Sequence, residues 1–371
     1  MELIDIYKDT PDEMIIDLDE PKRLADLLSG DEALARRVMD LLGGMEDYNQ
    51  IQGVIKELED VVSTEDISDT IKHVIDRVIK LFVTTIEKLM DSGVVLAATA
   101  EYVAIRAENL RVNSRARTRK NKNPTFLITT RIQNLSVRYK PITNSANLLS
   151  HLRVLETVVD GYINGLDNVI LRPASIIPSY MTPNASPDAL AELLLNSAPT
   201  KITTPSIYRD QGNRFVSLHL LGNHQIVINY NPDKNASAYD QCRDISSRLV
   251  PSEETPRPLP VEIEFEHFNH QVTESIIDRV VKVVDKINRA NAASMRTRRN
   301  ERLRTLKGAL IRFRDELTRA RNEGRPDREI QELVSLVETY VDWLAIPYHD
   351  LFKLTCRNLT AILNVCDENL K

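Results

Sequence analysis

The feature that most constrains the fold is a long amphipathic stretch from Val272 to Arg321. Apolar residues recur there at steps of three and four in two runs, which places each run on one stripe of a helix. Since no Gly or Pro intervenes before Gly308, we expect one continuous helix, held at both ends by other parts of the chain or by partners. The two runs are Val272, Ile276, Val280, Val283, Ile287 and Ala290, then Leu303, Leu306, Leu310, Phe313, Leu317 and Ala320.

Helical patterns also fill the N-terminal part of the chain. Acidic residues dominate residues 1–20, where Lys8 is the one basic residue, and this predicts an acidic arm. Residues 21–114 predict a helical bundle, because short loops between helices favour antiparallel packing. Its clearest helix begins near Ile67 and is expected to end at Gly93, before a partner helix that continues to residue 114.

The middle of the chain has a different composition, with β-branched residues and many prolines. Residues 124–142 predict one or two strands, and residues 261–265 predict a last strand. The best hairpin signal is two β-like segments, within residues 214–230, on either side of Gly222-Asn223. Helices are expected at 145–163, 187–196 and 239–249. Residues 124–267 therefore predict a small α+β domain.

The long helix is expected to end near Asn322, because Gly324 and Pro326 follow. Asp327 caps a final helix that Pro347 must kink or break, which predicts a helical hairpin folded back on the long helix. The fold class is thus mainly α with a smaller α+β middle domain, and the helical units on either side of it are expected to pack separately. The predicted domains are an acidic arm (1–20), a helical bundle (21–114), a basic linker (115–123), the α+β domain (124–267), and the long helix with the C-terminal helical hairpin (268–371).

Little in the sequence indicates catalysis or a cofactor. His267 and His270 have a spacing that could bind a metal, but no second ligand pair accompanies them, so surface or capping roles are preferred. Asp160 and Asp167 lie near glycines and are expected to form turns. No nucleophile or phosphate-loop motif occurs. We therefore predict no metal, no cofactor and no enzymatic activity.

Cysteine content and hydropathy indicate where the chain is made. Cys242, Cys356 and Cys366 are too few and too scattered for a disulfide framework, and are expected to be buried free thiols in a reducing compartment. No secretory leader is visible, and the best apolar run is far shorter than a membrane-spanning helix requires. A cytoplasmic site of synthesis and no membrane contact are expected.

The net charge of −6 conceals two strongly basic segments. Arginine binds phosphate bidentately, so these segments could contact a nucleic-acid backbone without reading its sequence. They lack interleaved aromatic residues, and base stacking is not indicated. The alternative is that the arginines pair with the acidic arm or with an acidic neighbouring subunit, since charge runs are more often solvated or paired. The first group of candidate nucleic-acid residues lies on the long helix and is expected to wrap around it: Arg296, Arg298, Arg299, Arg302 and Arg304. A second patch consists of Arg115, Arg117, Arg119 and Lys120.

Over its whole length the chain resembles the virion structural proteins of large tailed bacteriophages, in particular the internal head proteins. The resemblance lies in the acidic arm, the helical bundle, the Pro-rich α+β middle and the Arg-rich segment from Asn288 to Arg304. It implies a non-enzymatic protein packed with or near the genome inside a virion. It also implies many copies, assembled with other structural subunits or as a homo-oligomer. Two alternatives stay open: a scaffold or adaptor without nucleic-acid contact, and an enzyme with an unrecognised site in the middle domain.

Overall fold

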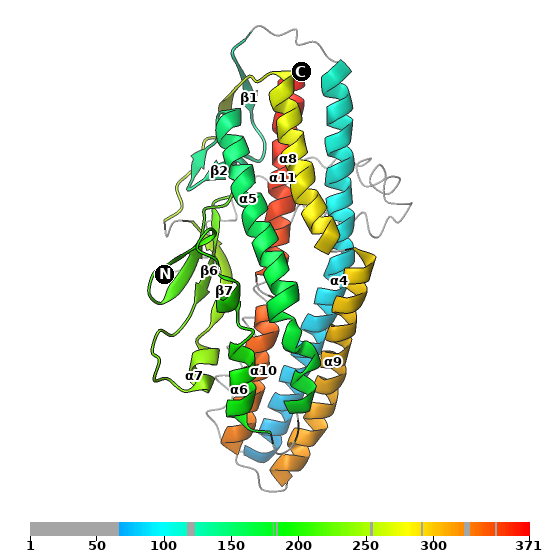
Figure 1. Cartoon of the computed structure of the whole chain (residues 1–371), viewed down its shortest axis with the longest axis vertical. Coiled ribbons are helices and arrows are strands. Elements are labelled where there is room, and N and C mark those ends of the chain that lie inside the picture. The colour runs from blue at the N-terminus through cyan, green and yellow to red at the C-terminus, as the bar shows by residue number, and fades with distance from the viewer. Residues whose placement is uncertain are drawn as a thin grey trace.

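A computed structural model describes residues 67–116, 123–180, 182, 185–252, 255–290, 292–322, 327–345 and 347–371. Long helices run along an elongated molecule, and a small β-region lies against one side (Figure 1). This confirms the predicted class, mainly α with a smaller β-containing middle region. The acidic arm and the predicted helices before residue 67 lie outside the described residues.

Helix α4 (Ile67–Ala116) is continuous, so the predicted break at Gly93 is wrong. A glycine costs a helix only about 1 kcal/mol relative to alanine. Buried residues on both sides of Gly93, among them Ile86 and Leu96, outweigh that cost by holding both halves against the rest of the molecule.

The helices from the two ends of the chain pack together. Helix α4 contacts α8 (His270–Ala290), α9 (Ala293–Asn322) and α11 (Tyr348–Leu370). The expectation of separately packed helical units on either side of the middle region is therefore wrong for the part of the bundle from residue 67 onward. The apolar stripes predicted on both sets of helices bury one another.

The predicted long helix is two helices, because α8 ends at Ala290 and α9 begins at Ala293. The carbonyl of Ala290 accepts a hydrogen bond from Arg299 Nη2 at 3.1 Å. A side chain thus satisfies one of the carbonyls that a helix end leaves without an intrahelical partner. Sequence patterns alone cannot show this contact, since neither Gly nor Pro marks the break.

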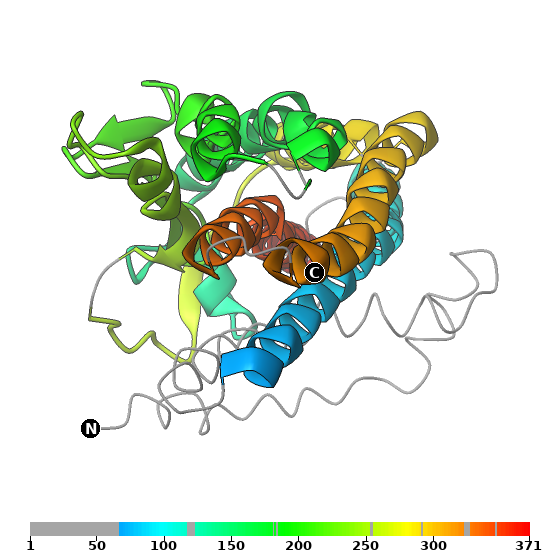
Figure 2. The same cartoon turned by 90° about the horizontal axis from the view of Figure 1, so that it is seen from below.

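The C-terminal helices correct a second prediction. Helix α9 runs to one end of the molecule, and α10 (Asp327–Ala345) returns from there, as the stop signal predicts. After Pro347, however, α11 continues toward the opposite end instead of folding back on α10 (Figure 1). Helix α11 is buried around most of its circumference, and it lies inside the other long helices when the molecule is viewed along its axis (Figure 2).

In the described part of the middle region there are three small sheets. The predicted hairpin is confirmed as β5 (Arg214–Ser217) and β6 (His224–Asn229), with Phe215 opposite Ile228. Strands β4 (Tyr208–Asp210) and β7 (Ser246–Pro251) extend it to the order β4-β5-β6-β7. The predicted helix at 239–249 is shorter, as α7 (Ala238–Arg243), because β7 takes up its second half.

The first and last strands of this region pair with each other, and two short strands between them form a second, local pair. β1 (Thr125–Ile128) is antiparallel to β8 (Ile263–Glu266), and β2 (Ser136–Val137) to β3 (Lys140–Pro141). The remaining elements are η1 (Ile132–Leu135), α5 (Ser145–Gly165), η2 (Leu166–Ile170), η3 (Arg172–Ser175), η4 (Ile177–Tyr180), α6 (Pro187–Leu195) and η5 (Pro199–Ile202).

Candidate nucleic-acid interface

Helix α9 has one buried face and one face open to solvent. Leu303, Leu306, Leu310 and Phe313 are buried, and the helix packs on α4, η3 and η4. Arg and Lys far outnumber Asp and Glu along α9. The burial of each cation therefore decides which of them can meet a ligand.

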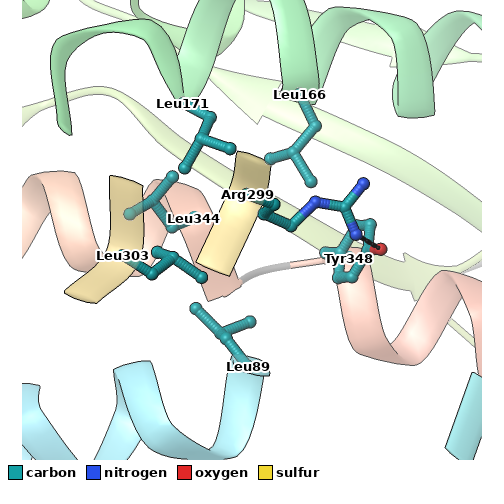
Figure 3. A pocket seen from close by; sticks show the side chains of 7 residues that line it. All are labelled: Leu89, Leu166, Leu171, Arg299, Leu303, Leu344 and Tyr348. Carbon is teal, nitrogen blue, oxygen red and sulfur yellow. Dashed lines mark hydrogen bonds between the residues drawn. The ribbon is translucent and has the colours of Figure 1, made fainter. Parts of the chain in front are cut away.

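Arg299 is not available to bind nucleic acid, so the prediction that places it on the nucleic-acid surface is wrong. It lies four residues before Leu303 on the buried stripe, and only 7% of it is exposed. Its Nε and Nη2 donate to the two carboxylate oxygens of Asp167 at 3.0 and 2.7 Å. Its Nη1 donates to the Tyr348 hydroxyl at 2.6 Å, as Figure 3 shows. Arg299 is therefore a charged residue of the core, and its guanidinium is bound by other side chains of the protein.

The two aspartates predicted to form turns are instead in helices and pair with cations. Asp160 lies in α5, 2.7 Å from Lys286 Nζ of α8. Asp167 lies in the π-helix η2, and its side chain is 11% exposed. Their partners come from α8 and α9, far along the chain, which is why local sequence could not reveal the pairing.

The other predicted arginines of α9 differ in exposure. Arg296 and Arg302 are half-buried, and Arg302 Nη1 is 3.5 Å from the Asp167 carbonyl oxygen. Arg298 and Arg304 are exposed, and no ion pair joins either to another residue of the described chain. The five arginines therefore do not surround the helix as equal ligands, and the open positions lie on its outer side.

The second predicted patch is described only at Arg115, the last basic residue of α4. Its Nη2 is 2.9 Å from Glu274 of α8, and Arg111 is 2.7 Å from Asp278. Arg115 thus pairs within the protein, with α8 rather than with the acidic arm or neighbouring subunit of the alternative explanation. Its hydrogen bond lowers the pKa of Glu274. Arg117, Arg119 and Lys120 lie outside the described residues.

Sequence reasoning stopped at Arg304 and missed two further arginines of α9. Arg312 and Arg319 are exposed, and like Arg298 and Arg304 they have no ion pair with the described residues. The signal that could have found them is their spacing of seven, which continues from Arg298 through Thr305 and keeps residues on one side of a helix.

Other candidate chemistry does not converge on a site. His267 Nδ1 lies 3.0 Å from Asn369 Oδ1, whereas His270 is 3.5 Å from Glu274. Among the described residues, no group of His, Cys, Asp and Glu side chains is arranged to hold a metal ion. The cavity in Figure 3 is lined by leucines together with Arg299 and Tyr348. No helix within the described ranges has the length and apolarity needed to span a membrane.

The three cysteines are buried and free, as predicted. Burial raises the pKa of Cys242, Cys356 and Cys366 to about 12, so each thiol stays protonated and unreactive at neutral pH.

The described residues thus form a mainly helical protein with a buried Arg299–Asp167 ion pair and an exposed cationic side of α9. A family model for phiKZ-like phage internal head proteins matches residues 31–368, and the chain belongs to that family. It is accordingly a structural protein of a phage virion, located within the virion. The chain matches no curated protein and no solved structure.

Proposed function

We propose that this internal head protein contacts nucleic acid inside the virion through Arg298 and Arg304 and has no enzymatic role. The observation that carries the proposal is that both guanidinium groups are exposed on the outer side of α9 without an ion-pair partner in the described chain. Exposed arginines on a helix present N–H donors whose planar geometry matches that of phosphate oxygens.

The buried residues on the opposite side of α9 support the same proposal. Leu303 and Leu306, between and beyond the two arginines, are buried, which fixes the helix and directs Arg298 and Arg304 away from the core. Contacts of this kind bind the phosphate backbone without reading base sequence. A protein that meets packaged genome of any sequence needs that property.

A second candidate function is assembly with other head subunits, or with further copies of this chain, without nucleic-acid contact. The pair Arg115–Glu274 favours it, because a basic residue of the second predicted patch is used there for a contact within the protein. An acidic partner subunit could occupy the outer side of α9 in the same way.

A binding titration separates the two functions. The purified full chain is titrated with a fluorescent duplex of mixed sequence at low salt, and compared with the variant Arg298→Gln/Arg304→Gln. Arg209→Gln is the matched control, since Arg209 is exposed on β4 and has no ion pair with the described residues. We expect binding that Arg209→Gln preserves and the double variant weakens at least tenfold. Absence of wild-type binding at low salt would instead favour the assembly function.

A further inference from the structure

The exposed arginines of α9 form a line along one side of the helix. Arg298, Arg312 and Arg319 are separated by multiples of seven residues, which is close to a whole number of helical turns. Arg304 lies beside this line, about 80° around the helix from Arg312 and about 120° from Arg298 at 100° per residue. All four are exposed, whereas the buried stripe of Leu303, Leu306, Leu310 and Phe313 occupies the opposite side.

These four arginines differ from several other cations of α9 in having no ion pair with the described residues. Lys307 pairs with Glu87 of α4, Arg314 Nε is 3.0 Å from Asp315, and Arg299 is bound to Asp167. Within the described residues, none of the four exposed arginines makes such a pair. Lys307 and Arg299 are thus paired with carboxylates of other elements, whereas the four exposed arginines have no such partner among the described residues.

We propose that Arg312 and Arg319 belong to the same nucleic-acid surface as Arg298 and Arg304, and that this outer strip binds the backbone of a double-stranded nucleic acid. The inference rests on the proposed function, because it extends that site. The strip is the outer side of α9 from Arg298 to Arg319, and at 1.5 Å per residue it is about 31 Å long. That length is close to one turn of a B-form duplex, about 34 Å, so a straight helix can meet phosphates at both ends of one turn.

A duplex fits the strip better than a single strand does. Single-strand binding relies on aromatic side chains on which bases stack. Phe313 is the one aromatic residue of α9, and it is 2% exposed on the buried side. The strip therefore offers charge and hydrogen bonds to a backbone but no surface for bases.

One acidic residue weakens the strip. Glu301 is exposed and lies three residues from both Arg298 and Arg304, so that its carboxylate repels any phosphate bound between them. Asp315 also lies on the outer side, but Arg314 Nε contacts its carboxylate. Glu301 therefore limits the affinity of the strip.

The test measures the salt dependence of binding for the full chain and a set of variants. Four phosphate contacts predict a slope of log affinity against log salt near −3.6 on duplex, which is about a 150-fold loss between 50 and 200 mM salt. Arg312→Gln/Arg319→Gln should reduce the slope by about two. Affinity for a single strand of equal length should be lower, with a slope of about −2.8 or shallower.

Glu301→Gln supplies a variant whose expected effect is a gain, which misfolding cannot imitate. It should raise duplex affinity severalfold, whereas Glu264→Gln, which changes the net charge equally at an exposed position of β8, should not. The strip is overturned if Arg298→Gln/Arg304→Gln weakens binding while Arg312→Gln/Arg319→Gln and Glu301→Gln leave it unchanged. A wild type that does not bind would instead reject the proposed function itself.

Discussion

Arg299 donates from Nε and Nη2 to both carboxylate oxygens of Asp167, which lies 132 residues earlier in the chain. The same guanidinium also binds the Tyr348 hydroxyl at the start of α11 and the Ala290 carbonyl at the end of α8. Burial raises the pKa of Tyr348 to about 12, so that hydroxyl remains neutral. One side chain thus joins the points where α5 passes into η2, α8 ends and α11 begins.

This relationship predicts that Asp167→Asn is strongly destabilising. It removes the charge that compensates a buried guanidinium, and breaking a buried pair in this way costs about 3–5 kcal/mol. Urea unfolding followed by circular dichroism measures the loss. Asp160→Asn is the control, because the side chain of Asp160 is 41% exposed and its pair with Lys286 should contribute at most about 1 kcal/mol.

Neighbouring positions on α9 are predicted to respond in opposite ways to truncation. Leu303 is 2% exposed, so Leu303→Ala leaves a cavity and should cost about 2–5 kcal/mol. Arg304 is exposed, and Arg304→Ala should change the free energy of unfolding by less than about 0.5 kcal/mol. Equal unfolding midpoints for the two variants would show that the inner and outer sides of α9 have been misassigned.

The half-buried carboxylate of Asp342 predicts a pH-dependent contribution to stability. Burial raises its pKa to about 6, against a smaller opposing effect of Arg248. The folded state therefore binds this proton more tightly than the unfolded state, and the stabilisation present at acidic pH is lost as the pH rises from about 4 through 6.

Asp342→Asn should remove that dependence. At pH 7 the variant is expected to be more stable than the wild type by about 1–2 kcal/mol, with the difference vanishing toward pH 4. Asp350, whose pKa burial also raises, is unchanged in both proteins and cancels in the comparison. A difference that grows toward pH 4 would contradict the assignment.

Two glycines with positive φ provide a matched pair. A Cβ at Gly222 (φ +80°) would lie 2.6 Å from Leu354 Cδ1 of α11, whereas a Cβ at Gly212 (φ +91°) would meet nothing within 4 Å. Gly212→Ala should cost only the backbone strain of about 1–2 kcal/mol. Gly222→Ala should cost a further 1–3 kcal/mol or so, because Leu354 must move. Thermal unfolding of the two variants should show the larger loss at Gly222.

Periodicity predicted the helices and the main hairpin, because burial of one face imposes the spacing of apolar residues. It could not predict where α8 ends, since the Ala290 carbonyl at that end is satisfied by the side chain of Arg299, nine residues further along the chain. Nor could it predict that α4 passes through Gly93, because packing on α8, α9 and α11 supplies the stabilisation that local sequence lacks there.

The candidate site was predicted in its residue type and its segment but not in its membership. Arg299 is a charged residue of a type usually found at the surface, but it lies in the core. Its buried charge is compensated by Asp167, which the sequence did not identify as its partner. Arg312 and Arg319 were not predicted, because they lie outside the dense run of arginines at Arg296–Arg304 on which the prediction was based. Exposure depends on which side of α9 faces α4, η3 and η4, and that is a property of the tertiary fold.

The central claim is that the outer arginines of α9 hold nucleic acid. It is tested most directly by measuring the nucleic acid that co-purifies with the full chain at low salt, from the ratio of absorbance at 260 and 280 nm. The wild type should carry nucleic acid that high salt releases, and the variant with Gln at positions 298, 304, 312 and 319 should carry little while keeping the wild-type circular dichroism spectrum. Equal amounts on both proteins, or none on the wild type, would contradict the claim.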